Sequence, residues 1–505
     1  MFNCKSKHEL YYLTHALNDV ASVHANNCDY ETALEYYNTL LQIYRSDLST
    51  SPSNSTLFGI SSVYFKKGNY ERALHFLLIA LNNSELLFGN NSPETASAYN
   101  NIGAVYQAKG EYDKALMYYK KALIIRESSF GNNHIITAST YNNLGYIYQI
   151  KGDFTSSMTY YKKALVIYEK SYGLEHAETA IIYNNIGIVY QAKCDYNNAL
   201  FYYKKALDIS LKTYGLYYPL TAQTYINISI AYQELGELDK AIDKIMLALD
   251  IQIKIYGENH PETASTYHNI AYFYYCSGNI DKALSNYEHA LKIKEKELGI
   301  MHSSTATTYN GIASVYQAKG EYEKALEMYK TALKIRKKVL DSKNPATATT
   351  YFGIGRTMFE KGDYEPAYEY FIEALNIRLE VFGTNHPDTA RSYCELAKIY
   401  EVQKNYQVAY DYYAKSLDIF ITIYGKEYEE TVQCISKIID ISELFVNSNS
   451  IDKSLLFTHQ VETLFEDNYG VSHIVTRYIY HLLYTLYQAN NDFDSSMIYY
   501  IKSLQ

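Results

Sequence analysis

The chain has 505 residues, enough for about three ordinary globular domains or for one extended repetitive array. Its net charge of −9 and its lack of a Lys/Arg-rich block argue against nucleic acid as a partner. Six cysteines without CxxC spacing, a start ("MFNCKSKHEL") without a signal-peptide hydrophobic region, and no apolar run of about 18 residues favour a cytoplasmic protein without membrane insertion.

The 59 tyrosines are explained by a period of 42 residues. One column of this period consists of Tyr99, Tyr141, Tyr183, Tyr225, Tyr267, Tyr309, Tyr351 and Tyr393. A small residue follows four positions after each tyrosine, starting with Gly103, and unbroken leucine and isoleucine columns start at Leu123 and Ile125. Such self-similarity is typical of an array of stacked structural repeats.

Each repeat is predicted to form two helices joined by a tight turn, which in the copy from Tyr99 lies at Gly110. The apolar stripe of its first helix comprises Tyr99, Ile102, Gly103 and Tyr106, and that of its second helix comprises Ala115, Tyr119, Ala122 and Leu123. A single hairpin cannot bury these stripes, so neighbouring hairpins must stack on it.

Taken in chain order, the pattern predicts twelve such hairpins. Their second helices are expected to begin at Tyr30, Tyr70, Tyr112, Phe154, Tyr196, Leu238, Ile280, Tyr322, Tyr364, Tyr406, Ile451 and Phe493. We expect an irregular repeat in residues 1–50, a regular array in 51–425, and a degenerate repeat plus a final one in 426–505. We also expect a dimer mate, another partner or further sequence to cover the last apolar face.

The pattern Tyr99-x-x-Ile102-Gly103-x-x-Tyr106, continued by Ala115-x-x-x-Tyr119-x-x-Ala122, resembles the tetratricopeptide repeat signature. The 42-residue period and the linker "GENHPETA", which begins at Gly257, resemble the kinesin-light-chain and nephrocystin-3-like subclass. This resemblance implies an all-α, right-handed superhelical solenoid whose first helices line a concave groove. It also implies a non-catalytic scaffold or adaptor that binds a peptide segment of a partner protein.

Three other functions stay open. One is a peptide-responsive sensor that acts on a separate partner, and another is a structural spacer. The third is a kinesin-light-chain-like cargo adaptor, which we expect to lack the heptad coiled coil of those proteins because the repeats begin almost at Met1.

Amide side chains recur on the inward face of the first helices. Relative to Tyr99, a helical wheel places Asn100 and Gln107 on the concave side and Asn101 on its flank. Because an amide both donates and accepts hydrogen bonds, a ladder of amides suits the backbone of an extended peptide. The resemblance implies that asparagine at the Asn101 position contacts such a peptide.

The predicted groove consists of Asn100, Asn101, Gln107, Asn142, Asn143, Gln149, Asn184, Asn185, Gln191, Asn227, Gln233, Asn269, Asn310 and Gln317. Alternatively, these side chains cap helices, bridge neighbouring hairpins by hydrogen bonds, or keep the concave surface hydrated.

Basic residues on the inward face are concentrated at Arg356, Arg391 and Lys398, which form a candidate patch for an acidic ligand. The alternative for this patch is local pairing with neighbouring glutamates such as Glu360 and Glu395.

Other conspicuous residues have structural explanations. The linker histidines are expected to pack at helix starts, because stacked repeats lie too far apart for two of them to share a metal ion; they are His134, His176, His260, His302 and His386. The paired lysines that begin at Lys120, Lys162 and Lys204 are expected on a solvated outer face. No motif of a P-loop, zinc protease or serine hydrolase is present, so we expect neither catalysis nor a cofactor.

Overall fold

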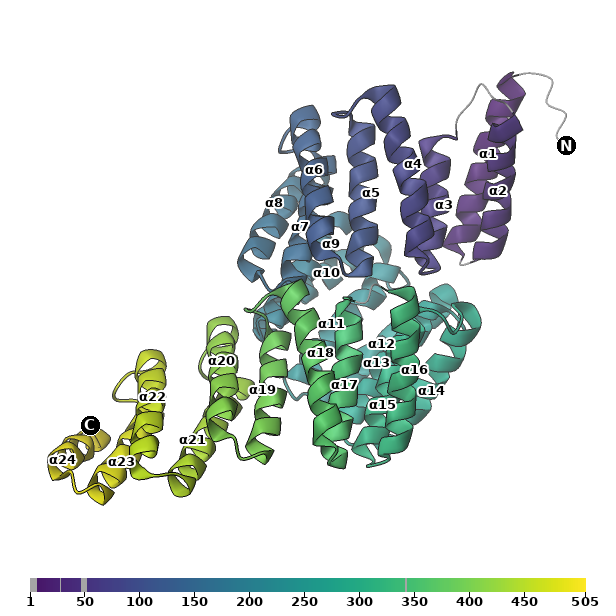
Figure 1. The fold of residues 1–505 in the computed structure, drawn as a ribbon. Coiled ribbons are helices and arrows are strands. Elements are labelled where there is room, and N and C mark those ends of the chain that lie inside the picture. Colours follow the sequence, from purple (N-terminus) through teal and green to yellow (C-terminus); the bar gives the residue numbers. More distant parts are fainter. Residues whose placement is uncertain (1–6, 28, 47–51, 341–342) are drawn as a thin grey trace. The chain divides into compact units, whose positions relative to one another are not determined.

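The computed structural model describes residues 7–27, 29–46, 52–340 and 343–505. The described residues form helices joined by turns and short loops, without strands (Figure 1). Two compact units divide the chain, unit 1 from Met1 to Thr350 and unit 2 from Tyr351 to Gln505. The expected domain ranges followed the regularity of the repeats, whereas these units follow contacts between residues.

Unit 1 is a series of helical hairpins. In order, they are α1 (Lys7–Asn26) with α2 (Tyr30–Ser46), α3 (Asn54–Lys66) with α4 (Tyr70–Phe88), α5 (Pro93–Lys109) with α6 (Tyr112–Phe130), α7 (Ile135–Ile150) with α8 (Phe154–Tyr172), α9 (Ala177–Ala192) with α10 (Tyr196–Tyr214), α11 (Pro219–Glu234) with α12 (Leu238–Tyr256), α13 (Pro261–Cys276) with α14 (Ile280–Glu297), and α15 (Ser303–Ala318) with α16 (Tyr322–Val339). The boundary between the units falls within α17 (Pro345–Lys361).

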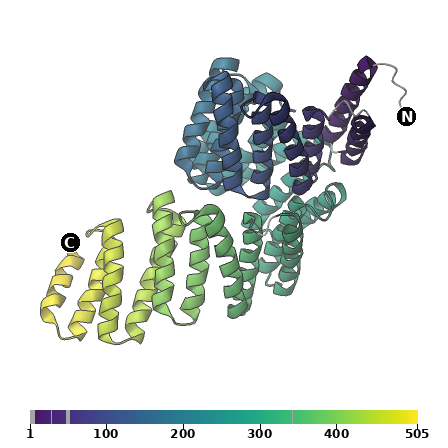
Figure 2. The same cartoon turned by 45° about the horizontal axis from the view of Figure 1, so that its top comes forward.

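Unit 2 continues the pattern after α17. Its helices are α18 (Tyr364–Phe382), α19 (Pro387–Val402), α20 (Tyr406–Tyr424), α21 (Glu429–Ser448), α22 (Ile451–Tyr469), α23 (Ile474–Ala489) and α24 (Phe493–Leu504). Figures 1 and 2 show α19 to α24 side by side in chain order. Every second helix begins at the residue expected from the repeat, so the predicted all-α array of twelve helix-turn-helix hairpins is confirmed over the described residues.

The turns of the hairpins match the expected turn chemistry. Gly110 ends α5 with φ 81° and ψ 8°, a left-handed conformation that is costly for residues with a Cβ. In most of the following repeats, His side chains cap the next first helix; His134, for example, accepts a hydrogen bond at Nδ1 from the backbone N–H of Ile136 at 3.2 Å. The same ring stacks on Phe130 at 4.8 Å, so the expected packing of these histidines at helix starts is confirmed.

Each hairpin is closed by a large aromatic side chain lying on a small residue. Tyr161 of α8 is fully buried, and a Cβ added to Gly145 of α7 would lie only 2.7 Å from its ring. A Cβ on Gly103 or Gly187 would likewise lie 2.9 or 2.5 Å from the ring of Tyr119 or Tyr203. The small-residue column therefore lets the two helices of a hairpin approach each other, and the tyrosines fill the remaining core.

Stacking places the first helices on the inner side of unit 1. The first helices of successive hairpins, such as α7, α9 and α11, contact one another more closely than the second helices do. Unit 1 also returns on itself. The side-chain amide of Asn344 donates to the backbone carbonyl of Lys109, 235 residues earlier in the chain, and a Cβ on Gly68 would lie 3.3 Å from His302.

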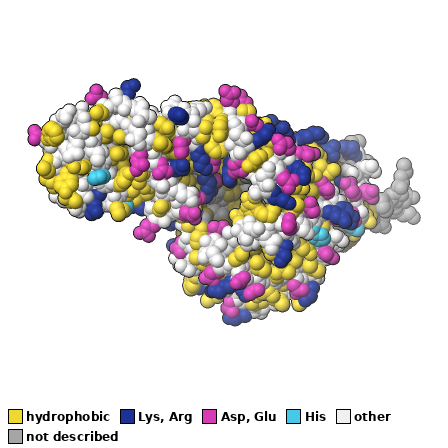
Figure 3. Space-filling view, turned by 90° about the horizontal axis from the view of Figure 1, so that it is seen from below, with side chains coloured by type: hydrophobic (Ala, Val, Ile, Leu, Met, Phe, Trp, Pro, Cys, Tyr) yellow, Lys and Arg dark blue, Asp and Glu magenta, His cyan; other side chains and the backbone are white. Residues whose placement is uncertain are grey.

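The surface carries both signs of charge. Basic and acidic side chains are interspersed on the face shown in Figure 3. The lysine pairs that begin at Lys120, Lys162 and Lys204 are exposed, as expected; Lys121 lies over the ring of Tyr99 at 5.4 Å. None of the described helices contains an apolar stretch that could span a lipid bilayer.

The last helix, α24, buries only Ser496 and leaves large apolar side chains exposed, among them Phe493, Met497 and Leu504. The cover expected for this face stays a prediction.

Candidate functional site

The asparagines of the first helices connect neighbouring repeats. Asn143 Nδ2 donates to Asn100 Oδ1 at 3.0 Å, and Asn185 Nδ2 donates to Asn142 Oδ1 at 2.7 Å. The same link joins Asn227 to Asn184 at 3.5 Å. These bonds are the bridging arrangement that the sequence left open as an alternative to peptide contact.

Burial separates these asparagines into two groups. Asn184 and Asn227 are only 4% and 7% exposed, and Asn184 also donates to Thr224 Oγ1 at 2.8 Å, so both belong to the repeat interface. The other members are partly exposed; they are Asn100, Asn101, Asn142, Asn143, Asn185, Asn269 and Asn310. Asn310 donates to Thr350 Oγ1 at 3.2 Å across the next repeat.

The glutamines form a second ladder that is anchored by buried tyrosines. Oε1 of Gln107 accepts a hydrogen bond from the hydroxyl of Tyr119 at 2.9 Å. Gln149 and Gln191 accept in the same way from the tyrosine twelve positions later, at 3.1 and 2.9 Å. Gln317 follows with Tyr329 at 3.4 Å. Each anchored glutamine is partly exposed on the first-helix side of its hairpin.

Gln233 departs from this ladder for a physical reason. The residue twelve positions later is Ile245, which has no hydroxyl, and the buried Oε1 of Gln233 has no partner among the described residues. In unit 2 the equivalent of the glutamine is Glu401, which accepts from the hydroxyl of Tyr413 at 3.2 Å. The tyrosine anchor therefore tolerates a carboxylate in place of the amide.

The anchor determines which atoms of the amide are available. Because the oxygen of Gln107, Gln149 or Gln191 is held by a tyrosine, its NH₂ group is left to donate, and the structure gives that group no partner within the described chain. These donors recur once per repeat on the side where first helices contact one another. Such a row can bind backbone carbonyls without specifying side chains.

Unit 2 brings the three predicted basic residues together. Arg356, Arg391 and Lys398 line one cavity of about 580 Å³ together with Phe352 and Tyr413. Each cation also has a carboxylate neighbour. Arg391 contacts Asp388 and Glu430, each at 3.0 Å, Lys398 contacts Glu395 at 2.9 Å, and Arg356 lies 3.6 Å from Glu360. Local pairing therefore accompanies the cavity, and binding of an acidic ligand there stays a prediction.

The same cavity holds two cysteines that sequence reasoning treated as scattered. Cys394 Sγ of α19 lies 3.4 Å from Cys434 Sγ of α21, and the hydroxyl of Ser416 lies 3.0 Å from the first sulfur. The two residues are 40 positions apart. A search for short spacings such as CxxC misses a pair that is joined by repeat stacking.

A column of buried, mostly polar residues was also missed. The position that follows the isoleucine column is occupied by Arg126, Tyr168, Ser210, Gln252, Lys294, Arg336, Arg378 and Phe420. Four of these residues, Arg126, Lys294, Arg336 and Arg378, are cations that are no more than 6% exposed. The signal was present in the 42-residue period, since charged residues recur there beside an apolar stripe.

A model of the tetratricopeptide repeat matches residues 52–128, 94–170, 136–212, 178–252, 220–296, 304–378 and 358–422. No curated protein sequence matches the chain.

Several solved structures are similar to parts of the chain. BtubC (BKLC) from P. vanneervenii is 23% identical with a TM-score of 0.36, and the match covers 48% of this chain and 92% of that chain. The putative kinesin light chain repeats of Podosopora anserina are 23% identical with a TM-score of 0.34, and the match covers 41% of this chain and 98% of that chain. A Rap protein complexed with competence and sporulation factor is 16% identical with a TM-score of 0.49, and the match covers 81% of this chain and 98% of that chain.

Proposed function

The chain belongs to the tetratricopeptide repeat family, and on that premise we propose that it is a non-catalytic scaffold that binds an extended peptide segment of a partner protein. The peptide lies along the first helices of unit 1. The observation that carries this proposal is the row of side-chain NH₂ groups at Gln107, Gln149 and Gln191. In each of these amides a tyrosine hydroxyl donates a hydrogen bond to the oxygen and so fixes the orientation of the NH₂ group.

Pre-orientation makes these amides useful for binding. A free glutamine side chain loses about 1.5–2 kcal/mol of rotamer entropy when a ligand immobilises it. The tyrosine hydroxyl already restrains each of these side chains in the unbound protein, so a peptide carbonyl bonds a donor that is already positioned. Asn100, Asn101 and Asn143 lie on the same first helices, and the donors and acceptors that the bond from Asn143 to Asn100 leaves unused add to this row.

An adaptor role and a cytoplasmic location are parts of the same proposal. Repeat arrays of this type present extended concave surfaces to their partners. The position of the peptide on unit 1 leaves the outer lysine pairs and the exposed face of α24 available to further proteins.

A second candidate is a peptide-responsive regulator, which is favoured by the return of unit 1 on itself. The side chain of Asn344 forms a hydrogen bond with the backbone of Lys109. The first helices from α7 to α15 lie between these two residues in the sequence. A ligand that spreads those helices would strain this bond, so occupancy would be coupled to closure.

The test compares wild-type protein with the triple variant Gln107→Glu, Gln149→Glu and Gln191→Glu. A carboxylate keeps the acceptor for each tyrosine, as Glu401 does for Tyr413, but removes the donors. Peptides selected from a random library on the wild-type protein should bind the variant roughly 100-fold more weakly, because three hydrogen bonds of about 1 kcal/mol each are lost. Fluorescence anisotropy measures the affinities.

The matched control is Lys120→Gln, Lys162→Gln and Lys204→Gln, which changes the net charge by the same amount on the exposed outer face. This control should bind the selected peptides as the wild type does. Equal affinities of all three proteins, or failure of any peptide to be enriched, would contradict the proposed groove.

A further inference from the structure

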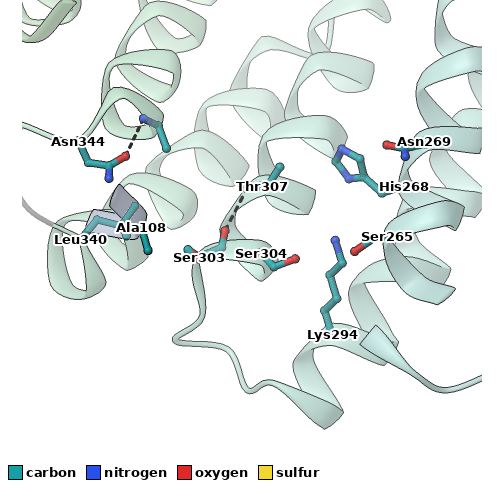
Figure 4. A pocket seen from close by; sticks show the side chains of 11 residues that line it. Ala108, Ser265, His268, Asn269, Lys294, Ser303, Ser304, Thr307, Leu340 and Asn344 are labelled. Carbon is teal, nitrogen blue, oxygen red and sulfur yellow. Dashed lines mark hydrogen bonds between the residues drawn. The ribbon is translucent and has the colours of Figure 1, made fainter. Parts of the chain in front are cut away.

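A polar cavity lies on the inner side of unit 1, where α13, α14 and α15 meet. It has a volume of about 470 Å³, and its lining also includes Leu340, Asn344, Ala346 of α17 and Ala108 of α5. Figure 4 shows Lys294 extending from α14 toward Ser265 and His268 of α13, with Thr307 of α15 nearby. A volume of this size accommodates a side chain or a small group of a ligand.

Lys294 is the least satisfied cation of the buried column. It is 2% exposed, and its hydrogen bond within the described chain goes from Nζ to Thr308 Oγ1 at 3.1 Å. An ammonium has three donors, and burying one with so few partners is costly. Its compensation within the described chain is this one hydrogen bond and the electrostatic influence of Glu262.

The arginines of the same column show what a structural cation looks like here. Arg378 donates to the carbonyl oxygen ten residues later, Asp388, at 2.9 Å and to the hydroxyl fourteen residues later, Ser392, at 2.7 Å. Arg126 makes the equivalent bonds to Ile136 and Thr140, and a third to Ser139. Lys294 makes only the hydroxyl bond. The lysine side chain is shorter than that of arginine and does not bond the carbonyl oxygen ten residues later. The cavity occupies the space where that bond would lie.

His268 provides a second polar group without a partner. It lies in the cavity wall, its ring meets that of Tyr287 edge-on at 4.9 Å, and its buried Nδ1 has no hydrogen-bond partner among the described residues. Burial and the charge of Lys294 lower the pKa of His268 to about 3, so the ring is neutral near pH 7. Lys294 is thus the single positive charge of the cavity wall.

We propose that this cavity binds one carboxylate of the peptide, with Lys294 as the ionic partner and His268, Ser265 and Asn269 as polar neighbours. The inference rests on the proposed peptide-binding function and adds the chemical class of one anchor residue. A carboxylate carries one charge, which matches one ammonium. A phosphate dianion would add a second negative charge beside Glu262, whose carboxylate already interacts with Lys294.

Small probes test the cavity without the rest of the groove. N-acetylglutamate N-methylamide presents a side-chain carboxylate, N-acetylalanine presents a C-terminal one, and N-acetylglutamine N-methylamide is the uncharged match. Calorimetric titration of the wild-type protein should show at least about tenfold tighter binding of one carboxylate probe than of the glutamine probe. The tighter of the two carboxylate probes identifies the source of the carboxylate.

Two variants link this binding to Lys294. Lys294→Met keeps most of the length of the side chain without its charge, and the preference for carboxylate should be lost. Lys294→Arg should weaken the preference as well, because the longer side chain can reach the Ser304 carbonyl as the other arginines reach theirs. The control Lys292→Met removes an exposed charge from the same helix and should leave the preference unchanged.

The inference would be overturned if neither carboxylate probe binds more tightly than the glutamine probe, if inorganic phosphate binds more tightly than both, or if Lys294→Met keeps the preference. The proposed groove is tested by a separate measurement, the affinity of selected peptides for the triple variant of Gln107, Gln149 and Gln191. A carboxylate preference that persists while selected peptides ignore the glutamines would refute the groove and leave the cavity as a carboxylate site.

Discussion

At the scale of single residues, the buried column of the second helices places cations where an apolar side chain is normally expected. Arg126 is 6% exposed and donates to Ile136, Ser139 and Thr140 of the next helix. A buried charge is retained at low cost only when such bonds replace its hydration. The arginine thus works as a link between neighbouring repeats.

Removing this link should destabilise unit 1. We expect Arg126→Met to lower the free energy of unfolding by about 1–3 kcal/mol, since the polar groups that the arginine satisfies become unpaired in a dry interface. Denaturant unfolding followed by circular dichroism measures the change. Lys121→Met, an exposed substitution on the same helix that loses only a contact with aromatic rings, should alter stability by less than about 1 kcal/mol. Equal effects of the two substitutions would show that the buried bonds contribute nothing.

Lys294 should behave in the opposite way. Its burial lowers the pKa to about 8 despite the opposing influence of Glu262, so the folded chain holds this proton less tightly than the unfolded chain, in which lysines titrate near 10.4. Protonation of Lys294 therefore opposes folding fully below about pH 8, and this opposition fades as the pH rises toward 10.

The measurement is the difference in Tm between Lys294→Met and wild type. The variant should melt higher at pH 7, and the gap should narrow between about pH 8 and pH 10. Two other titratable groups that face Lys294, His268 and His302, stay neutral across this range because burial lowers the pKa of each. Titration of the tyrosines does not contribute to the difference in Tm, because both proteins contain the same tyrosines. A gap that widens with pH would contradict the shifted pKa.

At the scale of elements, the hairpin depends on the contact between Gly145 of α7 and Tyr161 of α8. A Cβ at Gly145 would lie 2.7 Å from the tyrosine ring, so Gly145→Val should cost about 1–3 kcal/mol by overpacking. Tyr161→Ala should cost about 3–5 kcal/mol through the cavity it leaves. The double variant should lose less than the sum, because the removed ring makes room for valine. Additive losses in a double-mutant cycle would exclude this contact.

The helices of these hairpins were predictable, whereas their polar contacts could only be given as open alternatives. The starts of the second helices follow from residues within one repeat, such as Tyr112 after Gly110, so the 42-residue period reveals them. The bond between Asn143 and Asn100 depends on how far one hairpin is rotated on the next, which no single repeat encodes. The cavity at Lys294 depends on a missing bond, and only comparison with Arg378 in the folded chain reveals it.

At the scale of the molecule, unit 1 has a contact that a purely one-dimensional array lacks. In a solenoid each repeat contacts only its neighbours, so stability is a sum over adjacent pairs. The bond from Asn344 Nδ2 to the Lys109 carbonyl joins positions 235 residues apart. Asn344 Oδ1 also accepts from the N–H of Ala346 at 2.8 Å. Asn344→Asp keeps that acceptor and places a carboxylate against the Lys109 carbonyl, which should cost about 1–3 kcal/mol.

This cost should depend on the number of repeats between the two contacts. Deletion of residues 132–173 removes one 42-residue repeat from the interval, so Asn344 no longer returns to Lys109 although every remaining hairpin keeps its neighbours. The deleted protein should stay helical by circular dichroism, and Asn344→Asp should then cost nothing within about 0.5 kcal/mol. Deletion of residues 384–425 from unit 2 leaves the interval intact, so there the substitution should keep its full cost. An equal cost of Asn344→Asp in both deletion variants would mean that Asn344 acts only as the cap of α17 and that unit 1 is an open array. A cost that disappears only when residues 132–173 are deleted would mean that the closure of unit 1 sets the number of its repeats.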